Sequence, residues 1–320
     1  MVQHTTAYPT GPRVSVLIPA YNASSYIERT LDSVFAQTLT SYEIVLVDDG
    51  SEDSEELERI LKRYDAVRYV RNEHRGAAAA RNQGIQMARG EWVAFLDADD
   101  YWTARYLERQ MELLQQSSAD VVYCDAFLVA DGRVAKRTYM DLAPTRCAVS
   151  PESLLAVDVG IITSGVITRK TLLDAVGGFD ETITRGQDFE LWFRLAKNRA
   201  MFVCNRMRLL YYTLSETGLS GNESSQVQRT LELLKIIEQR GGLTANELDA
   251  LRHSRDHSLA ELAVIHGKDA MLRGEFSRAL EDFTAAKKLA GGWKLSTVCL
   301  ALRTAPQVLQ LAYRMRKLIR

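Results

Sequence analysis

The chain has 320 residues, 46% of them hydrophobic, which is enough for one large domain and a smaller second one. Forty basic and forty-one acidic side chains nearly cancel, and this excludes nucleic-acid binding of the electrostatic kind. Four scattered cysteines without C-x-x-C spacing, and an N-terminus without the pattern of a signal peptide, favour a cytoplasmic location.

The first hundred residues alternate between short apolar runs and helical apolar spacing. Strands are predicted at residues 14–18, 43–47, 67–70 and 92–96, with helices at 27–37, 54–64 and 77–87 between them. This alternation predicts an α/β fold with a parallel, doubly wound, Rossmann-like sheet and helices on both faces.

Beyond residue 103 the pattern becomes mixed and predicts a partly antiparallel extension of the sheet. A helix to about residue 116 precedes a strand at 120–128, a turn at Asp131-Gly132 and a returning strand at 134–139. A short helix opens at Ser150-Pro151, because proline is tolerated in a first turn. A strand at 161–168 and helices at 170–176 and 189–198 follow.

Acidic residues stand at the ends of two predicted strands and at one helix start. Asp48 and Asp49 follow the second strand, Asp97 and Asp99 follow the fourth, and Asp188 precedes the helix at 189–198. Ligands of open α/β sheets bind at the carboxyl ends of the strands, and two close carboxylates can share a cation with phosphate oxygens. The pattern indicates a metal diphosphate site. A solvated acidic turn, and a helix cap at Asp188, are the alternatives.

Five segments resemble the family 2 glycosyltransferases, in order and at the family's spacing. They are PAYNASSYIERTLDSVFAQT, VDDGSED, RGAAAARNQGI, FLDADD, and GGFDE with GQDFELWFRLA, within residues 13 to 215. The resemblance implies a GT-A fold for a domain at 13–220, a nucleoside diphosphate sugar donor, Mg²⁺ or Mn²⁺ as cofactor, and transfer with inversion.

The resemblance also implies a role for individual residues. Asp188 would be the catalytic base and Asp99 the metal ligand, while Asp49 would accept the imide N–H of uracil or thymine. Arg75 and Arg81 would contact the nucleotide, with a surface ion pair as the alternative for Arg81. The full set of implied nucleotide-sugar contacts is Pro19, Tyr21, Asn22, Asp48, Asp49, Arg75, Arg81, Asp97 and Ala98.

Two departures from the family pattern lie near these motifs. Gln187 stands where the family commonly has Glu before the base. The segment Tyr212-Thr213-Leu214-Ser215 lacks the histidine that the family often carries there, so no diphosphate contact is assigned to it.

The two ends of the chain differ from this domain. Residues 1–12 are polar and contain two prolines and a glycine, so we expect a flexible N-terminus. Residues 221–320 have helical spacing, and the stretch near 260–290 resembles a single tetratricopeptide hairpin. A lone repeat cannot bury its face unaided, so it either packs on the catalytic domain or pairs with another chain as a homo-oligomer.

The tail at 291–320 carries six basic residues, no acid and many apolar residues. This composition suits peripheral contact with an anionic membrane on its cytoplasmic face, or else a helical arm packed on its own domain.

The sequence therefore predicts an inverting glycosyltransferase. It would move a sugar from a UDP- or dTDP-linked donor to a hydroxyl of a glycan or lipid-linked acceptor in polysaccharide or lipopolysaccharide assembly. The alternative is a catalytically silent binding module that recruits partners through its helical tail. The joint presence of Asp49, Asp99 and Asp188 favours the enzyme.

Overall fold

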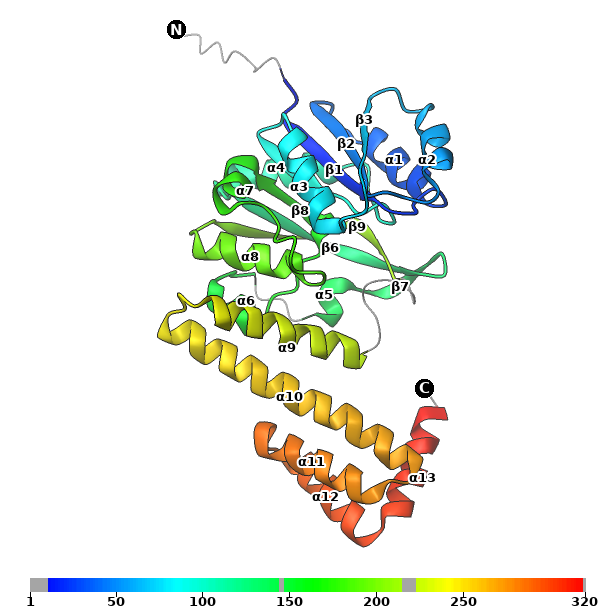
Figure 1. The fold of residues 1–320 in the computed structure, drawn as a ribbon, viewed down its shortest axis with the longest axis vertical. Coiled ribbons are helices and arrows are strands. Elements are labelled where there is room, and N and C mark those ends of the chain that lie inside the picture. Colours follow the sequence, from blue (N-terminus) through cyan, green and yellow to red (C-terminus); the bar gives the residue numbers. More distant parts are fainter. Residues whose placement is uncertain (1–10, 144–146, 215–222, 319–320) are drawn as a thin grey trace. The chain divides into compact units, whose positions relative to one another are not determined.

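The computed structural model describes residues 11–143, 147–214 and 223–318, which belong to two compact units, Met1–Ser215 and Glu216–Arg320 (Figure 1). Each unit has its own core. Most of the predicted flexible N-terminus, residues 1–10, lies outside the described residues, as does Ser215.

The first unit begins with four parallel strands in the order β3-β2-β1-β4. Ala20 pairs with Asp48, so β1 and β2 end at the same edge of the sheet. The elements are β1 (Val14–Ala20), α1 (Ile27–Phe35), β2 (Tyr42–Asp48), α2 (Ser54–Leu61), β3 (Val67–Arg71), α3 (Ala77–Met87) and β4 (Trp92–Phe95).

Helices cover both faces of this parallel sheet. Ile18 of β1 belongs to the same buried cluster as Leu31 of α1 and Leu57 of α2. Leu17, which points to the opposite face, lies against Gly84 of α3. The prediction of a parallel sheet with helices on both faces is confirmed.

The sheet continues from β4 through mixed pairings. β8 is antiparallel to β4 and β6, β9 is parallel to β6, and β7 forms a hairpin with β6 (Figure 1). The partly antiparallel extension is therefore also confirmed. Its elements are β5 (Tyr101–Trp102), α4 (Tyr106–Ser117), β6 (Val121–Ala130), β7 (Arg133–Thr138), α5 (Tyr139–Leu142), α6 (Pro151–Leu155), β8 (Val166–Arg169), α7 (Lys170–Val176), α8 (Gln187–Lys197) and β9 (Phe202–Thr213).

Two segments differ from the sequence prediction. The strand predicted at 161–168 begins only at Val166, because the preceding residues form a 3-10 turn, η1 (Thr163–Gly165), whose hydroxyl groups bond to α8 and to the loop after β4. The strand β9 was not predicted, because polar residues and two bulges opposite Asp125 interrupt the alternation that marks a strand.

The second unit is entirely helical in its described part, as predicted. Thr244 caps α10 through a capping box with Glu247, and α10 ends at Gly274. The helices are α9 (Glu223–Arg240), α10 (Ala245–Arg273), α11 (Phe276–Ala290), α12 (Trp293–Thr304) and α13 (Pro306–Leu318). Within the described residues, no helix is both long enough and apolar enough to cross a bilayer.

The tail forms two helices, α12 and α13, and its apolar residues point both inward and outward. Its inward residues pack on the core of this unit, and they are Leu295, Val298, Cys299, Leu302 and Leu309. Its outward residues include Trp293, Leu300, Val308, Leu311 and Met315. Ile319 and Arg320, and the side chains of Arg316, Lys317 and Leu318, lie outside the described part of the chain.

Candidate active site

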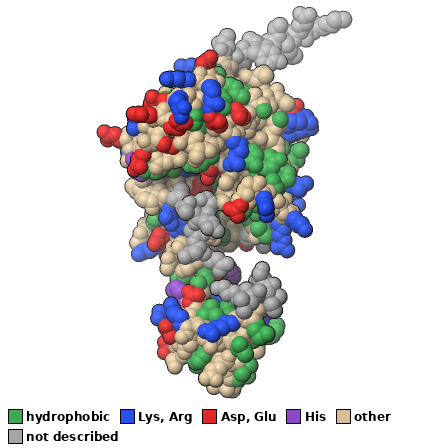
Figure 2. Space-filling model, turned by 90° about the vertical axis from the view of Figure 1, so that its right-hand side faces the viewer, with side chains coloured by type: hydrophobic (Ala, Val, Ile, Leu, Met, Phe, Trp, Pro, Cys, Tyr) green, Lys and Arg blue, Asp and Glu red, His purple; other side chains and the backbone are tan. Residues whose placement is uncertain are grey.

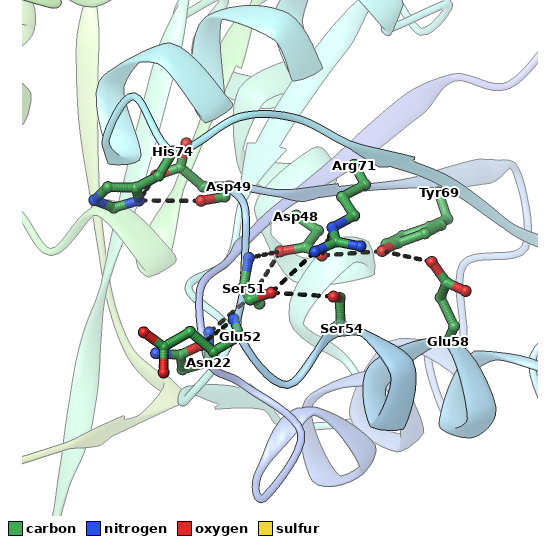
Figure 3. Close-up of polar contacts among 10 residues, drawn as sticks. All are labelled: Asn22, Asp48, Asp49, Ser51, Glu52, Ser54, Glu58, Tyr69, Arg71 and His74. Carbon is green, nitrogen blue, oxygen red and sulfur yellow. Dashed lines mark hydrogen bonds and ion pairs between the residues drawn. The ribbon is translucent and has the colours of Figure 1, made fainter.

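Asp48, the last residue of β2, is fully buried in a hydrogen-bond network (Figure 3). Its Oδ1 accepts from the backbone N–H and the hydroxyl of Ser51, at 2.9 and 2.5 Å. Its Oδ2 accepts from the hydroxyl of Tyr69 at 3.0 Å, and Arg71 Nε lies 3.8 Å away. Burial and the Asp48 charge raise the pKa of Tyr69. Asp48 thus braces the loop after β2, and its predicted contact with the nucleotide stays a prediction.

Asp49 is held by the loop that precedes α3. Its Oδ1 accepts from the Arg75 N–H at 2.9 Å and its Oδ2 from the Gly76 N–H at 2.8 Å. His74 Nδ1 lies 3.0 Å from Oδ2. The two loops approach so closely that a Cβ on Gly50 (φ +74°) would lie 2.7 Å from the backbone nitrogen of His74. A carboxylate has about four acceptor positions, so Asp49 keeps capacity for a further donor.

Two of the predicted nucleoside contacts, Tyr21 and Asn22, lie near Asp49 and His74. Asn22 (φ 50°) donates its N–H to Ser51 Oγ, and its Oδ1 accepts from the Glu52 N–H, which ties the end of β1 to the loop after β2 (Figure 3). Tyr21 is 44% exposed and its ring lies 4.4 Å from that of His74. His74 was missed by the sequence analysis, because a single histidine in a loop carries no signal by itself.

The remaining predicted contact on β1 lies within the strand. Pro19 is half-buried and pairs with Val47 of β2. Pro19, Tyr21, Asn22 and Asp49 thus all lie at the edge where β1 and β2 end. The sequence analysis predicted the nucleoside at this edge.

Arg81 of α3 forms a buried ion pair with Asp97, at 2.5 Å between Nη2 and Oδ1. The alternative prediction was an ion pair on the helix surface. The Arg81 side chain is only 8% exposed, so the pair with Asp97 is not of that kind. Burial opposes its charge, yet the carboxylates of Asp97, Asp188 and Asp99 together raise the pKa of Arg81. One guanidinium therefore lies near three of the five acids that the sequence singled out.

Asp99 follows Asp97 in a loop whose backbone is firmly anchored. The Asp99 carbonyl accepts from Arg29 Nη2 at 3.0 Å and Thr213 Oγ1 at 2.7 Å, and the Ala98 carbonyl accepts from Thr30 Oγ1 at 2.6 Å. The Asp99 carboxylate, in contrast, forms no ion pair within 4 Å in the described chain. Burial and the neighbouring Asp97 raise the pKa of Asp99 to about 6.

These crowded carboxylates fit a cation that is shared with a bound ligand. In the described part of the chain, no group of three His, Cys, Asp or Glu side chains forms a complete metal site. Mg²⁺ is commonly held by one or two carboxylates plus substrate phosphates, and Asp99 beside Asp97 provides that kind of donor set.

Asp188 is the second residue of α8, and Gly186 takes the N-cap position. The alternative that Asp188 is the helix cap is therefore wrong. Its Oδ1 accepts from the next N–H, of Phe189, and its Oδ2 accepts from the Thr163 hydroxyl, both at 2.9 Å. The helix N-terminus favours a negative charge at this position. Burial and the Asp188 charge raise the pKa of Tyr139 to about 12.

Hydrogen bonds join the segment before α8 to α3 and to the loop that precedes α3. Asn82 of α3 donates to the Phe179 carbonyl at 2.8 Å, and Arg75 Nη2 lies 2.6 Å from Glu181. A Cβ on Gly178 (φ +69°) would lie 2.5 Å from Asn82 Oδ1, so this turn requires glycine. The segment before α8 is thereby fixed to the helix that carries Arg81.

Comparison with known proteins connects this arrangement to one family. The family described as Glycosyl transferase family 2 matches residues 15–164. The amylovoran biosynthesis glycosyltransferase AmsB of Erwinia amylovora is 32% identical over 70% of this chain and 77% of its own length. WfgD of Escherichia coli, a UDP-Glc:alpha-D-GlcNAc-diphosphoundecaprenol beta-1,3-glucosyltransferase, is 28% identical over 69% and 85%. The chain spans about a third (32%) of the length of a matching uncharacterized glycosyltransferase of Rickettsia felis.

Solved structures share the fold. S. aureus TarS 1-349 in complex with UDP-GlcNAc superposes with a TM-score of 0.62 at 19% identity, covering 95% of this chain and 92% of that one. The mannosyltransferase PcManGT from Pyrobaculum calidifontis, in complex with GDP-Man and Mn²⁺, gives a TM-score of 0.62 at 21% identity and covers 94% and 84%. The predicted GT-A fold is confirmed, and with the match to AmsB the chain belongs to the family 2 glycosyltransferases.

Proposed function

We propose that this chain is a metal-dependent, inverting glycosyltransferase that uses a nucleoside diphosphate sugar as donor. The observation that carries the proposal is the ion pair of Arg81 with Asp97, with the charges of Asp188 and Asp99 near enough to act on the same guanidinium. Complexes of the fold relatives with UDP-GlcNAc and with GDP-Man and Mn²⁺ support a donor of this class. Because Asp49 is an acceptor-only carboxylate at the nucleoside edge, we propose a UDP- or dTDP-linked donor.

Asp188 acts as the general base. Its carboxylate takes the proton of the acceptor hydroxyl while that oxygen forms a bond to the anomeric carbon, and the bond from this carbon to the diphosphate breaks. A single displacement of this kind inverts the anomeric centre. Arg81, which is paired with Asp97, places a positive charge near Asp188.

Asp99 would hold Mg²⁺ or Mn²⁺ together with the donor diphosphate, and Asp97 would hold the ribose or a water of the cation. Held there, such a cation would offset the negative charge of the departing diphosphate. The carboxylate of Asp99 suits this task, because it lies beside another acid and forms no ion pair in the described chain.

The acceptor is proposed to be a hydroxyl of a growing glycan or lipid-linked glycan, in polysaccharide or lipopolysaccharide assembly. The names of AmsB and WfgD, an amylovoran biosynthesis enzyme and an enzyme acting on a diphosphoundecaprenol-linked sugar, support this class. A cytoplasmic enzyme would then meet its acceptor at the inner face of the membrane.

Peripheral membrane contact has a candidate surface on α12 and α13. Trp293, Leu300 and Val308 are 73%, 62% and 68% exposed, and the exposed bases Lys294 and Arg303 accompany them without any acid between 291 and 320. Figure 2 shows hydrophobic side chains gathered beside basic ones on this unit. Apolar residues among bases suit an anionic lipid surface.

The membrane proposal is tested with anionic vesicles. The full chain should sediment with them at about 0.1 M salt and be released at about 1 M, where the Debye length falls to roughly 3 Å. Leu300→Gln with Val308→Gln should abolish binding, whereas Met201→Gln, an equally exposed residue of the first unit, should not. A dimer that the double variant dissociates would show that a second copy covers this face in a homo-oligomer.

The enzymatic proposal is tested by a donor screen. We expect release of nucleoside diphosphate from one pyrimidine nucleoside diphosphate sugar in the presence of Mn²⁺ and an acceptor extract, and none with EDTA. A silent binding module would bind the nucleotide without releasing nucleoside diphosphate from any donor, and that result would contradict the proposal.

A further inference from the structure

We propose that Thr163 is a positioning residue for Asp188, through the hydrogen bond from its hydroxyl to Asp188 Oδ2 at 2.9 Å. A carboxylate only accepts, so the hydroxyl must be the donor. This donor fixes the plane of the carboxylate and favours its ionised form, which is the form that can take a proton. The inference rests on the proposed role of Asp188 as the base.

The turn that carries Thr163 is held rigidly. Thr163 is 5% exposed and Ser164 fully buried. The Ser164 carbonyl accepts from Trp102 Nε1 at 2.7 Å, and the Gly165 carbonyl accepts from Gln110 Nε2 at 3.0 Å. Trp102 and Gln110 therefore hold the backbone of the turn independently of Asp188.

The same turn also contacts the acidic loop that follows β4. The hydroxyl of Ser164 accepts from the Asp97 N–H at 3.0 Å. The hydroxyl of Thr163 thus contacts the proposed base, and the hydroxyl of Ser164 contacts the loop of the proposed metal ligand. These two parts of the site, at Asp188 and Asp97, are about ninety residues apart in the sequence. The turn η1 sets the base relative to the donor site.

Two other groups bear on the charge of Asp188, and neither replaces the hydroxyl. Arg81 approaches from α3, but its Nη2 is engaged with Asp97. Tyr139 approaches from α5 and stays neutral near pH 7, because burial and Asp188 raise its pKa to about 12. On α8 itself, the Phe189 N–H donates to the other oxygen. Among the described residues, Thr163 therefore supplies the side-chain hydroxyl that donates a hydrogen bond to this carboxylate.

The test replaces the hydroxyl without changing the shape. Thr163→Val should lower kcat by about 10-fold or more, because a hydrogen bond to a charged group is lost. It should also move the acid limb of the kcat/KM profile upward by about one pH unit, since the ionised base loses a donor. KM for the donor should stay unchanged, and Thr163→Ser should restore both kcat and the profile.

Thr168→Val is the matched control. Thr168 lies on β8, is fully buried and has a hydroxyl without a partner, so the same substitution removes no hydrogen bond there. We expect unchanged turnover. Thr163→Ala serves as a second hydroxyl-free variant, and it should give the same shift of the acid limb if Thr163→Val proves unstable.

The outcomes separate this inference from the proposed function. If Asp188→Asn abolishes turnover while both hydroxyl-free variants keep the wild-type kcat and acid limb, the positioning role of Thr163 is wrong and the base assignment stands. If Asp188→Asn retains turnover, the base assignment itself fails. In the double variant, Thr163→Val should add no further loss to Asp188→Asn, because there is no base left to position.

Discussion

The carboxylates of β2 and those that follow β4 lie at the same sheet but differ in how they are satisfied. Glu43, Asp48 and Asp49 each accept several hydrogen bonds: Glu43 from Ser15, Arg89 N–H and Arg68, and the other two from the loops described above. In contrast, burial and then the charge of Asp97 raise the pKa of Asp99, and burial and then the charges of Asp99 and Asp97 raise the pKa of Asp100.

This difference separates acids that contribute to the fold from acids that are arranged to bind a ligand. The carboxylates of β2 and Asp49 have their hydrogen-bond partners within the chain, so they hold together the strands and loops around them. Those after β4 are crowded, and one buried oxygen of Asp100 has no partner. Natural proteins keep such unfavourable charge where a bound cation or substrate relieves it.

The largest expected effect is on turnover. Asp188→Asn keeps the shape of the side chain and removes the proton acceptor, so transfer should fall by about 10² to 10⁴. Donor binding by calorimetry should persist. Retained turnover would place Asp188 among the structural acids, with Asp48.

The second effect is on stability, on the β2 side. Asp48→Asn turns an amide N–H₂ toward groups that themselves donate, Ser51 or Tyr69, and leaves a buried donor unsatisfied. We expect the free energy of unfolding to fall by about 2 to 3 kcal/mol, measured by denaturant titration. A change below about 0.5 kcal/mol would mean that the network around Asp48 does not stabilise the fold.

The smallest effect depends on pH. Burial works against the charge of Glu43, but its hydrogen bonds from Ser15, Arg89 and Arg68 lower its pKa below 4.5 in the folded state. Its contribution is therefore present above pH 4.5 and lost as the pH falls through the folded pKa. Glu43→Gln should cost about 1 kcal/mol at pH 7, and the difference from wild type should shrink in acid. A difference that is constant down to pH 3 would contradict the linkage.

Much of this could be predicted from the sequence, because the signals are local. An apolar run followed by acids marks a strand end, and this sufficed to place Asp49 and Asp99 at one edge of a parallel sheet. The partners of those acids could not be predicted. Arg81 and Asp97 are sixteen residues apart, and Thr163 lies in a stretch that reads as a continuation of β8.

Long-range pairing explains the other differences. β9 has weak alternation of its own and is formed by its pairing with β6, more than seventy residues earlier. Strand propensity reflects packing against neighbours, so such a strand is visible only when its partner is known.

The central claim is that the acids after β4 are arranged for a cation and a diphosphate. Calorimetry of nucleoside diphosphate binding with and without Mn²⁺, on wild type and Asp99→Asn, tests it most directly. We expect Asp99→Asn to lose the Mn²⁺-dependent part of the affinity and to be at least as stable as wild type without metal, because one of the crowded charges is gone. Unchanged Mn²⁺-dependent affinity, or a clear loss of stability in the variant without metal, would show that Asp99 is a structural acid like those of β2.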